Sequence, residues 1–182
     1  STFMKESLRQ LSYPYWTFYW YMGSAPLAFY SWLSFLVTGI ANLFVSIDAA
    51  NKIIFFAAHI GSALIAYKFV KTATNNTKAA IVAALVYGLS FEHIGRIMVG
   101  RSITALTYLL TPLLFLAFEL RLNEKIGKYK FVAITAAIIA LLIFNHQADA
   151  VLIAAIFVIY AALRTLESGK SKIKAAAAET VL

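Results

Sequence analysis

The sequence predicts an all-α integral membrane protein, a polytopic bundle of five or six transmembrane helices. Of its 182 residues, 62% are hydrophobic and only 13% are charged, and the mean hydropathy is +0.78. Soluble domains carry about twice that share of charge, and so apolar a chain would leave a soluble fold without a wetted surface. The apolar residues form continuous runs, without the alternation typical of membrane-barrel strands. These observations exclude a soluble enzyme, a nucleic-acid-binding module and a disordered chain.

The first part of the chain, residues 1–25, is expected to be an interfacial or juxtamembrane segment. Residues 1–12 are polar, and residues 13–21 hold seven aromatic side chains in nine positions. Tyr and Trp combine an apolar ring with a polar tip, so they favour the boundary between headgroups and hydrocarbon. Gly23 and Pro26 mark the turn into the next element.

The transmembrane domain is expected over residues 26–163, because a helix needs about 20 apolar residues to cross the hydrocarbon core. Six candidate segments follow one another, at residues 26–45, 53–70, 79–91, 103–120, 131–144 and 150–163. Pro112 is expected to kink the fourth segment. The third, fifth and sixth segments have only 13 or 14 residues, so each either extends into its polar flanks or stops short inside a protein-lined cavity. Residues 164–182 are expected to be a solvated cytoplasmic tail.

The basic residues are distributed unequally between the two sides of the predicted bundle. The larger group is Lys68, Lys71, Lys78, Arg121, Lys125, Lys128, Lys130, Arg164, Lys170, Lys172 and Lys174, and the smaller is Lys52, Arg96 and Arg101. Eleven against three predicts that the first side is cytoplasmic, in a multi-pass protein of the cell membrane. Lys5 and Arg9 join the majority if residues 26–45 span the membrane, which the count slightly favours. They stay outside if that segment is interfacial or re-entrant.

The first candidate site is the polar segment 90–101, which is expected to face the outside. On a helix Glu92 and Arg96 share one face, with His93 and Arg101 beside it. A carboxylate, an imidazole and two guanidiniums can bind a phosphate and support acid–base chemistry, and Arg matches phosphate oxygens bidentately. The alternative is a salt bridge from Glu92 to Arg96, with the other side chains reaching lipid headgroups.

The second candidate site is the short polar junction that begins at Asn145. His146 and Asp149 are three residues apart and can orient one another, or, as a weaker alternative, hold a divalent cation with Glu92. Ionisable groups near membrane depth cost about 2.5–3.5 kcal/mol on insertion scales, so they are more often functional than decorative. A polar loop in water explains the junction almost equally well.

Two isolated ionisable residues are expected to be structural. His59, alone in the second segment, is expected to hydrogen-bond to a neighbouring helix, and Glu119 to be a solvated helix end. No metal site is expected, because such sites need three or four ligands and the chain has three His, no Cys and no dense set of carboxylates. The sequence identifies no cofactor.

Several short motifs also follow one another in a particular order across residues 13–163. They are the run Tyr19-Trp20-Tyr21-Met22-Gly23-Ser24-Ala25-Pro26-Leu27, then Tyr67-Lys68, Leu89-Ser90-Phe91, Gly100-Arg101, Leu110-Thr111-Pro112-Leu113 and Asn145-His146. This order resembles the GT-C glycosyltransferase superfamily. In particular, it is similar to the archaeal and bacterial membrane proteins labelled 6-pyruvoyl-tetrahydropterin synthase-related.

The resemblance implies transfer of a glycosyl group from a polyprenyl-phosphate-linked sugar at the extracytoplasmic face. Arg96 and Arg101 would then bind the donor phosphate, and Glu92 or Asp149 would act as a carboxylate. The candidates from motifs and resemblance together are Glu92, His146 and Asp149 as catalytic residues, and His93, Arg96, Arg101 and Asn145 as substrate-binding residues. The expected partners are membrane lipids, a polyprenyl-phosphate donor and subunits of a membrane complex, and not nucleic acid.

Members of the family begin with a spanning helix and an outward loop that carries a catalytic acid. Neither precedes Tyr13, so the chain is expected to be a fragment, one part of a split protein or an inactive relative. The main alternative function is a non-catalytic subunit or scaffold of a larger membrane complex. A transporter is a weaker alternative, because the other polar groups are expected at the membrane ends and only His59 is expected at the midplane.

Overall fold

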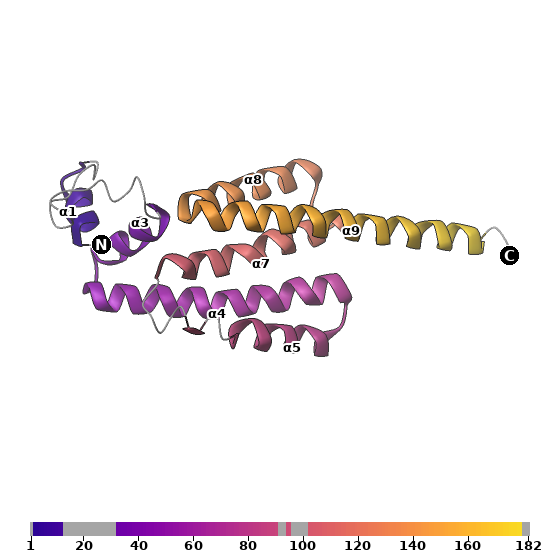
Figure 1. Ribbon diagram of the computed structural model, residues 1–182, viewed down its shortest axis with the longest axis horizontal. Coiled ribbons are helices and arrows are strands. Elements are labelled where there is room, and N and C mark those ends of the chain that lie inside the picture. Colours follow the sequence, from indigo (N-terminus) through magenta and orange to yellow (C-terminus); the bar gives the residue numbers. More distant parts are fainter. Residues whose placement is uncertain (1, 13–31, 91–93, 96–101, 180–182) are drawn as a thin grey trace.

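The computed structural model describes residues 2–12, 32–90, 94–95 and 102–179, and within these ranges the protein is an all-α bundle without a strand (Figure 1). The helices are α1 (Thr2–Arg9), α3 (Trp32–Ala41), α4 (Ile47–Thr74), α5 (Thr77–Gly88), α7 (Ser102–Leu122), α8 (Lys128–Asn145) and α9 (Gln147–Glu179). The predicted all-α class is confirmed. The aromatic run at residues 13–21 lies outside the described residues.

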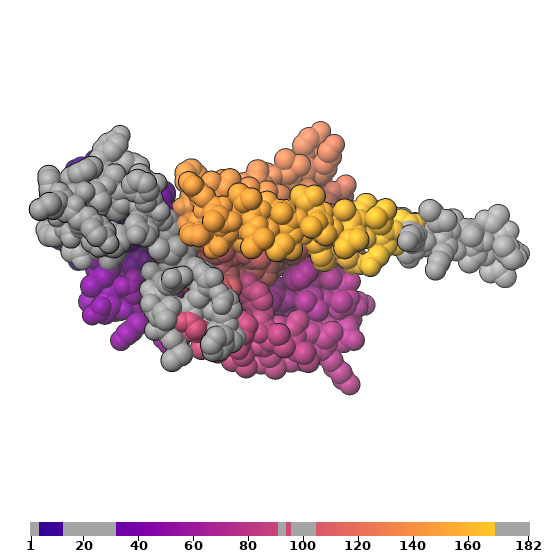
Figure 2. Space-filling view, viewed as in Figure 1, coloured from indigo at the N-terminus to yellow at the C-terminus, as the bar shows by residue number. Residues whose placement is uncertain are grey.

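Helix α7 is the centre of the bundle. It contacts α4 on one side and α8 and α9 on the other, and α5 packs along α4 (Figure 1). Half of the apolar stretch of α7 is buried, against 11–17% in α4, α8 and α9. Figure 2 shows α9, in orange and yellow, on the face turned to the viewer, with α4 and α5 below it. The outer helices therefore present most of their apolar surface outward, as helices in lipid do.

Four described helices are long and apolar enough to cross a membrane, namely α4, α7, α8 and α9. Helix α4 has 28 residues and is about 42 Å long, so both of its ends extend past a hydrocarbon core of about 30 Å. Helices α3 and α5, with 10 and 12 residues, are only about 15 and 18 Å long. The five or six expected spans thus correspond to four helices that are long and apolar enough to cross a membrane and two short apolar helices.

The loops collect many basic residues at one end of the bundle, which we call the basic end. It comprises the end of α4, the start of α5, the end of α7 and the start of α8. Asn123 after α7 donates a hydrogen bond to the carbonyl of Thr72 in α4 over 3.3 Å, which ties these loops together. The described basic residues there are Lys71, Lys78, Arg121, Lys125, Lys128 and Lys130. We call the other end, where α4 begins and α8 ends, the opposite end.

The N-terminal helices α1 and α3 both lie at the opposite end (Figure 1), and residues 26–31 of the predicted first segment lie outside the described residues. Helix α1 packs on α3, where a Cβ added to Gly39 would lie 2.5 Å from Cγ of Met4. Residues 1–12 are therefore more than a polar extension, because α1 buries Met4 and Ser7. Lys5 and Arg9 lie at the opposite end with Lys52, and among the described residues the basic end holds the larger number of basic side chains.

The short apolar segments reach their final lengths in different ways. The fifth and sixth segments extend into their flanks, as α8 and α9 show, and α9 continues without a break through the expected tail boundary at residue 164. Helix α5 instead stops at Gly88, which packs so closely on α4 that an added Cβ would lie 3.3 Å from Cβ of Ala63. One side of α4 is therefore covered by α5 over part of its length.

Pro112 lies inside α7 and removes one hydrogen bond from that helix. The missing N–H would have bonded to the carbonyl of Tyr108, four residues earlier. In the structure Tyr87 of α5 donates its hydroxyl to this carbonyl over 2.8 Å. The proline thus frees an acceptor that joins α5 to α7, and freed backbone groups in membrane helices need such a partner.

The core lies between α7, α8 and α9. It consists of Leu110, Leu114, Ile138, Leu142, Ala150 and Ile153. Toward the basic end, ring contacts continue this core with Phe69, Phe115, Phe118, Phe157 and Tyr160. In lipid, helices associate by packing and hydrogen bonds, because moving an apolar side chain from lipid to protein gains little. Interlocked rings and buried polar bonds therefore hold α9 on the bundle.

Candidate functional site

The first predicted cluster lies mostly outside the described residues. Glu92, His93, Arg96 and Arg101 are in this group, so their geometry remains a prediction. Ile94 of the same segment is described, and its amide donates a hydrogen bond to the carbonyl of Ser90 over 3.0 Å. Helix α5 before the segment ends at the flank of α4, and α7 after it begins at the opposite end.

The second predicted cluster is the junction of α8 and α9, where His146 is the single residue between the two helices. Its backbone is extended, with φ −157° and ψ 107°, and its carbonyl accepts the first hydrogen bond of α9 from Ala150. His146 is thus the N-cap of α9, a position that requires extended backbone and a side-chain acceptor. The junction turns sharply because one residue ends one helix and begins the next.

His146 and Asp149 form a close pair at this junction, as their spacing predicts. Nδ1 of His146 lies 3.2 Å from the carboxylate of Asp149 and 3.3 Å from the Asp149 amide nitrogen. A bare Nδ1 accepts from the amide, whereas a protonated Nδ1 donates to the carboxylate, so the two contacts belong to different states of the ring. The imidazole is 44% exposed. In the second state Nε2 is the basic nitrogen.

Asn145 is fully buried and binds two other helices. Ser34 of α3 donates its hydroxyl to Oδ1 of Asn145, and Nδ2 of Asn145 donates to the hydroxyl of Thr107 in α7, each over 2.7 Å. The rings of Trp32 and Phe144 lie beside this network, and their centroids are 6.2 Å apart. These contacts dock α3 onto the bundle, and they favour a structural role for Asn145 over direct contact with substrate.

Replacing Asn145 by alanine is expected to lower the free energy of unfolding by about 1–3 kcal/mol, because two buried hydroxyls lose their partner. Unfolding in mild detergent, followed by circular dichroism, measures the change. Replacing the neighbouring exposed Gln147 by alanine is the control and should have little effect. Equal stability of the two variants would contradict the structural role of Asn145.

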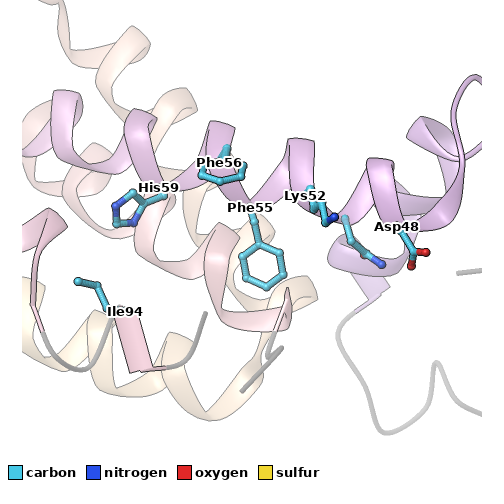
Figure 3. Close-up of a pocket in the computed structure, with 7 residues that line it drawn as sticks. Asp48, Lys52, Phe55, Phe56, His59 and Ile94 are labelled. Carbon is cyan, nitrogen blue, oxygen red and sulfur yellow. The ribbon is translucent and has the colours of Figure 1, made fainter. Parts of the chain in front are cut away.

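A cavity of about 490 Å³ lies against the first half of α4, at the opposite end. It is lined by Asp48, Asn51, Lys52, Phe55, Phe56, His59 and Ile94 (Figure 3). The α4 residues recur at steps of three and four, so they form one stripe along the helix. In Figure 3 His59 lies beside Ile94 and Asp48 lies at the other end of the stripe. His59 is an isolated ionisable residue in the sequence, but the helical spacing of these α4 residues predicts that they share one face.

Glu119 is the largest departure from the sequence analysis, which expects a solvated helix end. Its side chain is completely buried, and its carboxylate accepts hydrogen bonds from three donor groups that belong to two residues. Arg164 donates from Nε over 2.9 Å and from Nη2 over 3.1 Å, and the hydroxyl of Tyr160 donates to the same carboxylate. Arg164 also donates to the carbonyl of Ala73 in α4 and to the carboxylate of Glu167. The cluster joins three helices at the basic end.

No group of three or more His, Cys, Asp or Glu that could hold a metal ion occurs among the described residues. Fold and geometry define a helical membrane protein with polar groups near both ends of its bundle. In comparisons of the chain with protein-family models, curated proteins and solved structures, nothing matches.

Proposed function

We propose that this protein is the membrane core of a GT-C-like glycosyltransferase, which transfers a glycosyl group from a polyprenyl-phosphate-linked sugar at the extracytoplasmic face. The observation that carries the proposal is the His146–Asp149 pair at the opposite end, with an exposed imidazole 3.2 Å from a carboxylate. This arrangement suits a general base, because the carboxylate orients the ring. The order of motifs along the chain supports the same reaction class.

In the proposed reaction, the acceptor hydroxyl attacks the anomeric carbon of the donor sugar. Its proton passes to Nε2 of His146 as the new carbon–oxygen bond forms. The bond from the anomeric carbon to the phosphate oxygen breaks, and polyprenyl phosphate leaves with the electron pair. Arg96 and Arg101 would neutralise this phosphate, with His93 beside them and Glu92 as a second candidate base.

Replacing Arg96 and Arg101 together by glutamine is expected to weaken donor binding at least tenfold, which is about 1.4 kcal/mol. The purified protein in nanodiscs is incubated with polyprenyl-phosphate mannose or glucose, and both binding and release of polyprenyl phosphate are measured. The control carries glutamine at Arg121 and Lys125, which removes the same charge at the basic end. Unchanged donor binding in the first variant would rule out this phosphate site.

A non-catalytic subunit of a membrane complex is the second candidate, and the outer surface of α9 favours it. Apolar residues at least half exposed there are Val151, Leu152, Ile156, Val158, Ile159, Leu163 and Leu166. Such a surface suits a partner helix as well as lipid. Purification in mild detergent separates the candidates, because a subunit should elute with stoichiometric partners and an enzyme can elute alone.

A further inference from the structure

The cavity against α4 lies beyond the end of α5. Helix α5 begins at the basic end and stops at Gly88, beside Ala63, so it covers α4 only from that point onward. Beyond it, toward the start of α4, Ile94 is the residue outside α4 that lines the cavity among those described. We call this stripe of lining residues the α4 groove. Its volume of about 490 Å³ lies in the range of small-molecule sites.

With α4 across a membrane, as its length and composition allow, the groove runs from headgroup depth into the hydrocarbon. Asp48 is the second residue of α4, and His59 lies eleven residues further, about 16 Å along the helix axis. This is about half the thickness of the hydrocarbon core. Polar side chains therefore stand at the mouth, and the aromatic rings of Phe55 and Phe56 form the wall below them. A molecule with a polar head and an apolar chain fits this order of polarity.

The charges at the mouth select the kind of head. Asp48 and Lys52 are one helical turn apart and exposed, and no ion pair joins them in the part of the chain that the structure describes. Together they offer one negative and one positive group about 5–6 Å apart at their Cβ atoms. A zwitterionic head complements this pair, with its amine at Asp48 and its phosphate at Lys52. A phosphate monoester at the end of a chain would meet the repulsion of Asp48.

We propose that the α4 groove binds a phospholipid with a phosphoethanolamine head from the surrounding leaflet. The ethylene bridge of this head separates its amine from its phosphate by a span that suits one helical turn. One lipid chain lies against Phe55, Phe56 and Ile94, in the space that α5 leaves open. The site does not depend on glycosyl transfer, and it belongs to an enzyme and to a subunit alike.

Native mass spectrometry of the purified protein, titrated with defined lipids, tests the proposal. The probes are phosphatidylethanolamine, phosphatidylglycerol and a polyprenyl phosphate, each with the same total concentration. The wild type is expected to retain phosphatidylethanolamine about fivefold better than phosphatidylglycerol, the ratio that exposed charge pairs of up to about 1 kcal/mol give. Asp48→Asn should remove this preference, and Lys52→Gln should weaken retention of both phospholipids.

Lys68→Gln is the matched control, because Lys68 is an exposed lysine at the other end of the same helix. It should retain lipid as the wild type does, and thermal unfolding should show that all three variants fold. Equal retention of the two phospholipids by the wild type would overturn the proposal. Retention of the polyprenyl phosphate that is strong in the Arg96→Gln, Arg101→Gln protein and lost in Lys52→Gln would also overturn it and would assign the groove to the donor. A protein without transferase activity is still expected to show this lipid preference, so either proposal can fail while the other holds.

Discussion

Replacing Arg164 by alanine is expected to lower the free energy of unfolding by about 3 kcal/mol, the low end of the cost of leaving a buried charge unpaired. Glu119 is completely buried and would keep only the hydroxyl of Tyr160 as a charge-compensating donor. Arg164 also holds the carbonyl of Ala73, so its loss weakens the contact of α9 with both α7 and α4. Unfolding in mild detergent, driven by a graded denaturing detergent, measures the change.

Glu167→Ala is the control for this prediction. It removes the second ion pair of Arg164, but Glu167 is 67% exposed, so the cost should stay below about 1 kcal/mol. The double replacement Arg164→Ala with Glu119→Leu should be more stable than Arg164→Ala alone, because the buried carboxylate is gone. Equal stability of the Arg164→Ala and Glu167→Ala variants would show that Glu119 does not need its guanidinium.

The helices were predictable from the sequence because each is a local property of a continuous apolar run. The six segments correspond in order to α3, α4, α5, α7, α8 and α9. Their ends were less predictable. Ser46 caps α4 because its hydroxyl accepts a hydrogen bond from the amide of Ala49, so the helix begins six residues before the apolar run at residue 53. The early start brings Asp48 and Lys52 onto the helix and creates the mouth of the α4 groove.

The buried polar contacts were not predictable, because they join residues distant in the sequence. Glu119 reads as a helix end when only its neighbours are considered, and its partner Arg164 lies 45 residues later. Asn145 similarly meets Ser34 across 111 residues. By contrast, His146 and Asp149 are three residues apart, and their pairing is confirmed because it depends only on local helix geometry. Contacts within one or two turns are therefore readable from sequence, whereas contacts between helices require the packed bundle.

His146→Ala is expected to lower the rate of glycosyl transfer about 10²–10⁴-fold, the usual contribution of a general base. The variant also loses the N-cap of α9, which costs about 1 kcal/mol of stability. His146→Asn separates the two roles, because asparagine caps helices well but cannot take up the proton of the attacking hydroxyl group. Both variants should be similarly inactive, and only His146→Ala should unfold more easily than the wild type.

The rate of polyprenyl phosphate release from a polyprenyl-phosphate sugar, in nanodiscs with the acceptor present, gives the activity of each variant. Added imidazole should partly restore His146→Ala, because a free base can occupy the space that the ring leaves. Asp149→Asn should lower kcat with little change in KM, since its carboxylate orients the ring without touching the donor. A fully active His146→Asn variant would show that His146 only caps α9. The catalytic base would then have to be sought at Glu92, and an inactive Glu92→Gln variant would support that assignment. A wild-type protein that transfers no glycosyl group would leave the subunit as the better account of this bundle.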